Sequence, residues 1–103
     1  MKRITVIAGN DSISGQARTY AEYRTFALVA RHTTWVRQVR VFIRQAERRR
    51  GCDSVTCTVT VALNPSGSLR IRGTGSHVYA AINRAVERLG TVLGERVEQR
   101  VSS

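Results

Sequence analysis

The sequence predicts an α+β domain whose elements follow the order β-α-β-β-β-α, with a four-stranded mixed sheet and two helices packed on one face of it. Two segments place apolar residues at the three- and four-residue steps of a helix. Three segments between them alternate apolar and polar residues, as half-buried strands do. A short run of β-branched residues near the N-terminus supplies the fourth strand. With 103 residues, the chain is expected to form one domain over residues 1–103.

The N-terminal part of the chain is predicted to form one strand and one helix. Residues 3–8 are rich in β-branched side chains, and Gly9-Asn10 ends the run. From about Gln16 to His32 the pattern is helical. Aromatic residues at helical spacing are usually core residues, so we expect one stripe of this helix to be buried. The stripe comprises Tyr20, Tyr23, Phe26, Ala27 and Ala30.

Three strands are predicted in the middle of the chain, at residues 35–45, 52–63 and 69–73. Residues 46–53 are expected to form a charged hairpin tip, and the proline and glycine of residues 64–67 a turn. The first crossover makes strands one and two parallel, if they are adjacent, and the hairpins make the other pairs antiparallel. The predicted inward residues are Val39, Val41, Ile43, Val55, Cys57, Val59, Val61, Leu63, Leu69 and Ile71.

The last predicted element is a long helix that runs to about Arg100 without a proline. Ser76 is suited to accept a hydrogen bond from a free amide of its first turn. We interpret Gly73 and Gly75 as a tight turn into this helix. A phosphate-binding role for them is less favoured, because the lysine and the spacing of a phosphate-binding loop are missing. The apolar stripe comprises Val78, Ile82, Ala85, Val86, Leu89, Val92, Leu93 and Val97.

The strongest functional signal is the charge. Seventeen Lys and Arg residues against seven Asp and Glu residues give a formal net charge of +10 and a pI near 11.4. This balance indicates a polyanionic partner, with nucleic acid ahead of anionic lipid. Arginines and hydroxyl groups interleave on the solvent side of the predicted sheet, and both donate hydrogen bonds to phosphate oxygens. These residues are Arg3, Thr5, Gln38, Arg40, Arg44, Thr56, Thr58, Thr60, Arg70 and Arg72.

The sequence gives little support for an enzyme, a metalloprotein or a membrane protein. The carboxylates are scattered, and His32 and His77 have no nucleophile at a recognisable spacing. Cys52 and Cys57 are too few for a zinc site, and their five-residue offset puts them on opposite faces of one strand. We therefore expect no catalytic residue, no metal and no cofactor. No apolar run spans a membrane and no signal peptide is recognised, so we expect a cytoplasmic protein.

The order of elements and the long helix together resemble the ribosome hibernation-promoting factor family, also called ribosome-associated inhibitor A. The resemblance covers about residues 3–100, and its most specific part is Val78-Tyr79-Ala80-Ala81-Ile82-Asn83, followed by Leu89 and Leu93. The chain departs from the family in two ways. Ser76-His77 stand where members usually carry an acidic pair, and the basic residues of the last helix are fewer.

The resemblance implies a protein without catalytic activity that binds the small ribosomal subunit, in the channel used by mRNA and tRNA, and represses translation under stress. RNA contacts are expected from Arg84 and Arg88 on the long helix, because Arg88 matches a basic position of the family pattern. The open face of the sheet and the hairpin tip form the alternative surface. Its residues are Arg40, Arg44, Arg70, Arg72, Arg48, Arg49 and Arg50.

A second function stays open, that of a protein-interaction or dimerisation module that does not bind ribosomes. Phe42 is expected on the solvent face of the sheet, near Trp35 on an edge, where an exposed aromatic residue would seed a homodimer or a contact with an acidic partner. Longer members of the family carry a further dimerising domain, whereas this chain stops at Ser103.

Overall fold

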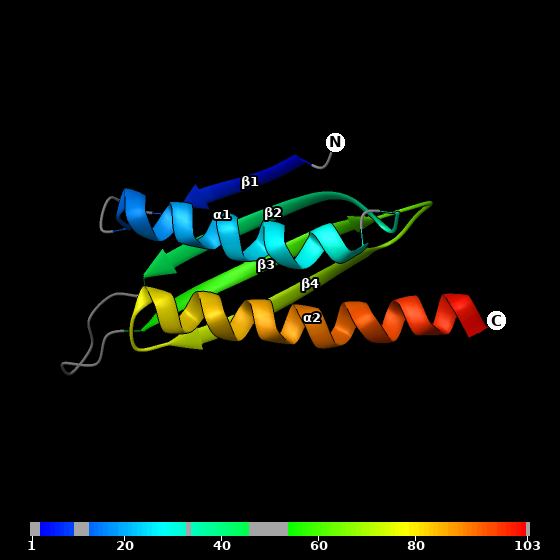
Figure 1. Cartoon of the computed structure of the whole chain (residues 1–103). Helices are drawn as coiled ribbons and strands as arrows, with labels where there is room; N and C mark the ends of the chain where they lie inside the picture. The colour runs from blue at the N-terminus through cyan, green and yellow to red at the C-terminus, as the bar shows by residue number, and fades with distance from the viewer. Residues whose placement is uncertain (1–2, 10–12, 33, 46–53, 103) are drawn as a thin grey trace.

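The structure is a computed structural model that describes residues 3–9, 13–32, 34–45 and 54–102. The predicted order of elements is confirmed, whereas the predicted hairpin tip at residues 46–53 lies outside the described residues. The elements are β1 (Arg3–Ala8), α1 (Gly15–Val29), the short 3-10 helix η1 (Ala30–His32), β2 (Val36–Gln45), β3 (Val55–Leu63), β4 (Ser68–Gly75) and α2 (Val78–Ser102) (Figure 1).

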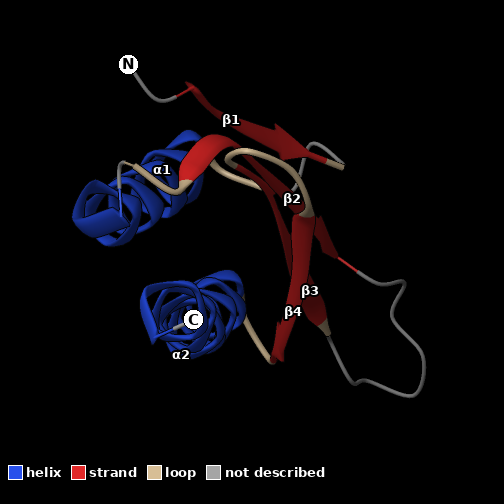
Figure 2. Cartoon of the chain, turned by 90° about the vertical axis from the view of Figure 1, so that its right-hand side faces the viewer, coloured by secondary structure: helices blue, strands red, loops and turns tan. Residues whose placement is uncertain are grey.

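The four strands form one sheet in the order β1-β2-β3-β4. β1 pairs with β2 in parallel, and the β2–β3 and β3–β4 pairs are antiparallel. Both helices cover the same face, with α1 against β1 and β2 and α2 against β3 and β4 (Figure 2). The described elements leave the other face of the sheet open. The predicted mixed sheet with two helices on one face is therefore confirmed.

The alternation of the strands decides which side chains reach the core. Every second residue faces the helices and is buried, as predicted, over residues 39–43, 55–63 and 69–73. Thr60 on the opposite side of β3 is exposed, and Thr56 and Thr58 are half-buried. A register shift of one residue would bury these hydroxyls and expose the valines, so the hydrophobic pattern specifies the register. The buried strand residues are Val36, Val39, Val41, Ile43, Val55, Cys57, Val59, Val61, Leu63, Leu69, Ile71 and Gly73.

Helix α1 buries a different face from the one that its aromatic residues predicted. Tyr23 and Phe26 are 68% and 57% exposed, and of the predicted stripe only Tyr20 is half-buried. The aromatic prediction was wrong because α1 has apolar residues on two sides and packing chooses between them. Small side chains at four-residue steps bring the helix close to its neighbours, where large rings would overfill the space. The buried residues of α1 are Ala17, Ala21, Thr25 and Val29.

Helix α2 turns the predicted apolar stripe toward the core, together with Ala81. Its N-terminus is capped by His77 and not by Ser76. The Ala80 amide donates to His77 Nδ1 at 3.3 Å, and the Ala81 amide donates to the His77 carbonyl oxygen at 3.1 Å. The imidazole ring thus takes the place that the sequence pattern assigned to the serine hydroxyl.

The glycines before α2 serve close packing. Gly73 and Gly75 are the last part of β4 and not of a turn. A Cβ atom at Gly73 would contact the Ala85 nitrogen and would lie 2.7 Å from the Ala81 carbonyl oxygen. A Cβ atom at Gly75 would lie 2.8 Å from the Ala81 nitrogen. The two glycines are therefore explained by the close approach of β4 to the α2 backbone.

The two helices are joined by residues of the motif that carries the family resemblance. The Tyr20 hydroxyl on α1 donates to Asn83 Oδ1 on α2 at 2.7 Å. The rings of Tyr20 and Tyr79 meet edge-on, with centroids 5.1 Å apart and an interplanar angle of 72°. Tyr79 and Asn83 are one turn apart on α2, so the same side of that helix presents both to Tyr20. The motif thus has a structural role at the contact between the helices.

Candidate nucleic-acid interface

The open face of the sheet carries arginines that the sequence predicts for RNA binding. Arg40 and Arg44 project from β2, and Arg70 and Arg72 project from β4. All four side chains are exposed. Successive side chains of a strand point to opposite faces of the sheet. The four arginines share the open face because they alternate with the buried Val, Leu and Ile residues of their strands.

Strand pairing arranges the open face in rows that run across the sheet. Neighbouring strands are about 5 Å apart, so Arg40 and Arg70 are separated by about 10 Å, with Thr60 of β3 between them. Successive rows along a strand are about 7 Å apart. The arginines are therefore spread over the whole face. Three of these rows are Thr5–Arg40–Thr60–Arg70, Ile7–Phe42–Thr58–Arg72 and Arg44–Thr56–Thr74.

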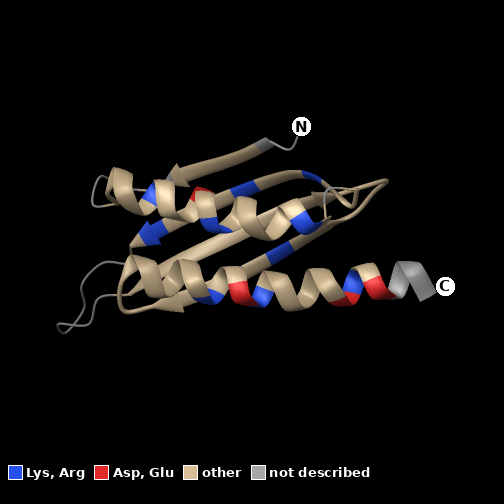
Figure 3. Cartoon of the chain, in the orientation of Figure 1, with Lys and Arg blue, Asp and Glu red and all other residues tan. Residues whose placement is uncertain are grey.

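Acidic residues are absent from the described strands. Those in the described part of the chain are Glu22, Glu87, Glu95 and Glu98, and all four lie on the helices (Figure 3). The guanidinium groups of the sheet therefore face solvent without a carboxylate among the described residues of the same face. Such a surface attracts polyanions, and guanidinium groups bind phosphate with charge-assisted hydrogen bonds.

The helix arginines lie along the free edge of the sheet. β4 is an edge strand, and Arg84 Nη1 donates to the Thr74 carbonyl oxygen at 2.8 Å. Arg88 Nη1 donates to the Arg72 carbonyl oxygen at 3.4 Å. The two side chains thus occupy carbonyl groups that β4 leaves unpaired with β3.

A hollow of about 370 Å³ brings the helix arginines and one sheet arginine together. Three guanidinium groups and one carboxylate surround it, so the hollow carries an excess of positive charge. The two surfaces predicted from the sequence therefore meet at the β4 edge. The hollow is lined by Arg72, Gly73, Thr74, Arg84, Glu87 and Arg88.

Part of the predicted surface lies outside the described residues, and two residues that the prediction omitted lie on or against the open face. Arg48, Arg49 and Arg50 lie outside the described residues. Ile7 shares the open face and was missed, although its two-residue offset from Thr5 was a sufficient signal. Gly9 is predicted only to end the first strand, but it lies against the Phe42 ring, a contact that no sequence pattern indicates.

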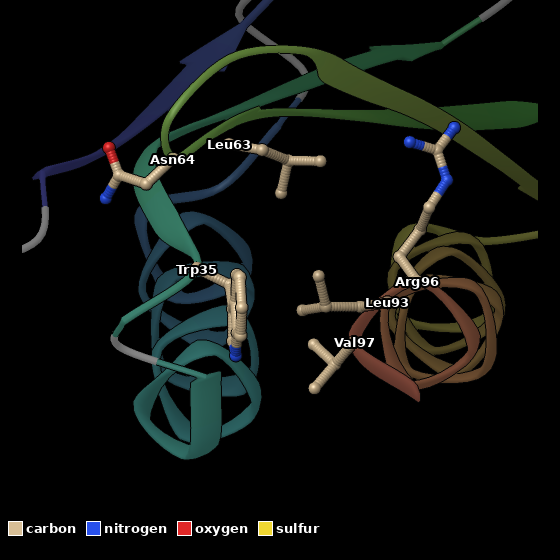
Figure 4. A pocket seen from close by; sticks show the side chains of 6 residues that line it. All are labelled: Trp35, Leu63, Asn64, Leu93, Arg96 and Val97. Carbon is tan, nitrogen blue, oxygen red and sulfur yellow. The ribbon is translucent and has the colours of Figure 1, made fainter. Parts of the chain in front are cut away.

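Phe42 and Trp35 do not form an aromatic pair at a sheet edge. Phe42 belongs to β2, which lies between β1 and β3. Trp35 precedes β2, and its ring faces Leu93 and Val97 of α2 across a crevice of about 10 Å³ (Figure 4). That volume holds about one water molecule, so the crevice has no room for a nucleobase. Its lining is completed by Leu63, Asn64 and Arg96.

Cys57 is a free thiol buried on the inner face of β3. Burial raises its pKa from 9.0 to about 12, so the thiol stays protonated at neutral pH and is a poor nucleophile. Cys52 lies outside the described residues. Among the helices in the described part of the chain, none has the length and apolarity needed to cross a lipid bilayer.

The fold and the open face define a class of small basic domain, in which two helices support one side of a sheet and arginines cover the other. Comparison with family models identifies the family. The model described as sigma 54 modulation protein / S30EA ribosomal protein matches residues 4–101. The chain belongs to this family, and its resemblance to the hibernation-promoting factors is confirmed. A family of ribosome-associated modulation factors gives no support for an enzyme.

Two solved structures share the fold. A ribosomal subunit interface protein from Coxiella burnetii has a TM-score of 0.73 at 14% identity, and the match covers 95% of this chain and 99% of that chain. The N-terminal domain of Protein Y from Thermus thermophilus has a TM-score of 0.66 at 27% identity, with 88% of this chain and 93% of that chain covered. A comparison with curated protein sequences finds no match.

Proposed function

We propose that this chain binds the small ribosomal subunit through contacts between its arginines and the phosphates of ribosomal RNA, and that the bound protein represses translation. The observation that carries the proposal is the open sheet face, with four exposed arginines and no acidic residue on the described strands. Family membership supports the ribosome as the partner. Ribosome binding implies a cytoplasmic protein.

The mechanism we propose is steric. Contacts to phosphates position a protein on RNA without reading its sequence. The two helices brace the sheet from behind, so the arginines are presented on a rigid layer. A rigid basic wedge held in the path of mRNA and tRNA would exclude both from the subunit, and no chemical step is needed.

The sheet arginines are the better candidates for the main RNA contacts. Arg84 and Arg88 donate to β4 carbonyl groups, and Glu87 lies beside them in the same hollow. Arg40 and Arg70 have no carboxylate on their face among the described residues. The β4 edge would extend this surface, since Arg72 reaches both the face and the hollow.

Co-sedimentation with purified small subunits tests the proposal. We expect the triple change Arg40→Gln, Arg70→Gln and Arg72→Gln to weaken subunit binding by at least about tenfold, because three phosphate-binding side chains are removed. The matched control removes the same charge from the helices, through Arg18→Gln, Arg31→Gln and Arg96→Gln, and is expected to bind almost normally. An equal decrease in both variants would show that net charge, and not the sheet face, governs binding.

A second candidate function rests on a different surface. Tyr23 and Phe26 expose aromatic rings on α1, on the side of the molecule away from the open sheet face. Such a pair is typical of a protein contact. Sedimentation velocity at rising protein concentration, without RNA, tests for self-association. A dimer that is lost in the double variant Tyr23→Ser, Phe26→Ser would support this function. A monomer at all concentrations would contradict the homodimer.

A further inference from the structure

We propose that the open sheet face binds single-stranded RNA and that one unpaired base stacks on the ring of Phe42. This inference rests on the proposed function and adds the kind of RNA that the face takes. It concerns base stacking, which the phosphate contacts described above do not require.

Phe42 and Ile7 form an apolar centre on an otherwise polar surface. They are 40% and 41% exposed and are partners in the β1–β2 register. The other exposed large apolar residues of the described chain are on the helices. An aromatic ring in the middle of a sheet face costs solvation unless a partner covers it. The position on an interior strand offers a flat surface and not an edge.

The Phe42 ring is held against the backbone of the neighbouring strand. The Gly9 amide donates to the Ile43 carbonyl oxygen at 2.7 Å, which extends the contact between the first two strands beyond Ala8. A Cβ atom at Gly9 would lie 3.3 Å from Phe42 Cζ. Glycine therefore leaves the room that the ring occupies. A ring with a supported position loses little freedom when a base stacks on it.

Arginines surround this apolar centre at the distances that a nucleotide chain needs. Arg40 and Arg44 are two residues before and after Phe42 on the same face of β2, each about 7 Å away along the strand. Arg72 lies in the same row as Phe42, two strands over. A base on the ring thus has guanidinium groups on three sides for its flanking phosphates, which is the arrangement of single-strand binding surfaces.

The same geometry disfavours the other partners. The bases of an RNA duplex are stacked on each other and cannot reach a ring on a flat sheet, so a duplex would use only the arginines. A basic protein would be repelled by four arginines. An acidic protein would pair with the arginines but would not need an aromatic ring among them. Single-stranded RNA uses both features.

Fluorescence polarisation with an eight-nucleotide labelled RNA and a duplex of equal length tests the inference. Phe42→Leu keeps an apolar side chain and removes the ring, so we expect single-strand binding to weaken by about 5- to 150-fold, as for the removal of one stacked base. Duplex binding and the salt slope are expected to stay unchanged. Phe42→Trp should retain single-strand affinity. The matched control Phe26→Leu, which removes a ring from α1, should change neither RNA.

Five outcomes decide the matter. Upfield shifts of the Phe42 ring protons in NMR spectra on adding single-stranded RNA would support stacking. Equal effects of Phe42→Leu on both RNAs, or no effect on either, would overturn it, even if the protein still sediments with small subunits. Binding of polyglutamate with the same dependence on Phe42 would assign the face to an acidic protein and also overturn it. A Phe42-dependent preference for single-stranded RNA, found without binding to small subunits, would support the inference and contradict the proposed function.

Discussion

At the residue scale, Gly73 sets the distance between β4 and α2. An added Cβ atom would overlap the Ala85 backbone and lie 2.7 Å from the Ala81 carbonyl oxygen. Gly73→Ala is therefore expected to lower the free energy of unfolding by about 1–3 kcal/mol, the usual cost of overpacking. Gly94→Ala is the control, because nothing lies within 4 Å of its added Cβ atom and alanine favours the helix by roughly 1 kcal/mol. Urea unfolding measures both, and equal decreases would contradict the close approach of the two backbones.

The buried thiol of Cys57 is expected to make stability depend on alkaline pH. Burial raises the pKa of Cys57 from 9.0 to about 12, so the folded state holds its proton where the unfolded chain releases it. The stabilising contribution is complete below pH 9 and is lost as pH rises toward 12. The test compares Cys52→Ser with the double variant Cys52→Ser, Cys57→Val. In this pH range the free energy of unfolding should fall faster in Cys52→Ser, by up to about 1.4 kcal/mol for each pH unit, because only this variant keeps the buried thiol. Identical pH profiles would show that the thiol is not desolvated.

At the scale of elements, Tyr20 couples α1 to α2. Its hydroxyl group donates to Asn83 and its ring meets Tyr79, so removing the hydroxyl leaves Asn83 without this donor. Tyr20→Phe is expected to lower the free energy of unfolding by about 1 kcal/mol. Tyr23→Phe removes the same atom from an exposed ring and should have no effect. Thermal unfolding compares the two, and equal melting temperatures would argue against the bond.

At the scale of the whole molecule, charge is divided between the two layers. The described strands carry arginine and no acid, while the helices carry both signs. Binding to RNA should therefore fall steeply with salt, by roughly 50- to 150-fold over a fourfold rise if four phosphates are bound. The triple sheet variant should lower the log–log slope by about 0.7–0.9 for each phosphate that is no longer bound. Filter binding at several salt concentrations measures the slope, and an unchanged slope would place the RNA surface elsewhere.

The strands, their register and the long helix followed from the sequence because local periodicity specifies them. Val55 to Leu63 alternates so regularly that a slipped register would expose the valines. The apolar residues of α2 lie on only one side of the helix, so the burial of that side was predictable too. The placement of the arginines on the open face followed from the same alternation. The prediction that they bind RNA did not follow from spacing alone and rested on charge and on the family motif.

The sequence by itself determined the order of elements, the inward face of each strand and the positive charge of the open face, since each depends on neighbours within a few residues. Only the tertiary structure decided which side of α1 is buried, because α1 has apolar residues on both sides and the closer packing of Ala17 and Ala21 prevails over the rings of Tyr23 and Phe26. It also decided that Arg84 and Arg88 reach the β4 edge and that Gly9 supports Phe42. These contacts join residues far apart in the chain, and no local pattern encodes such distances.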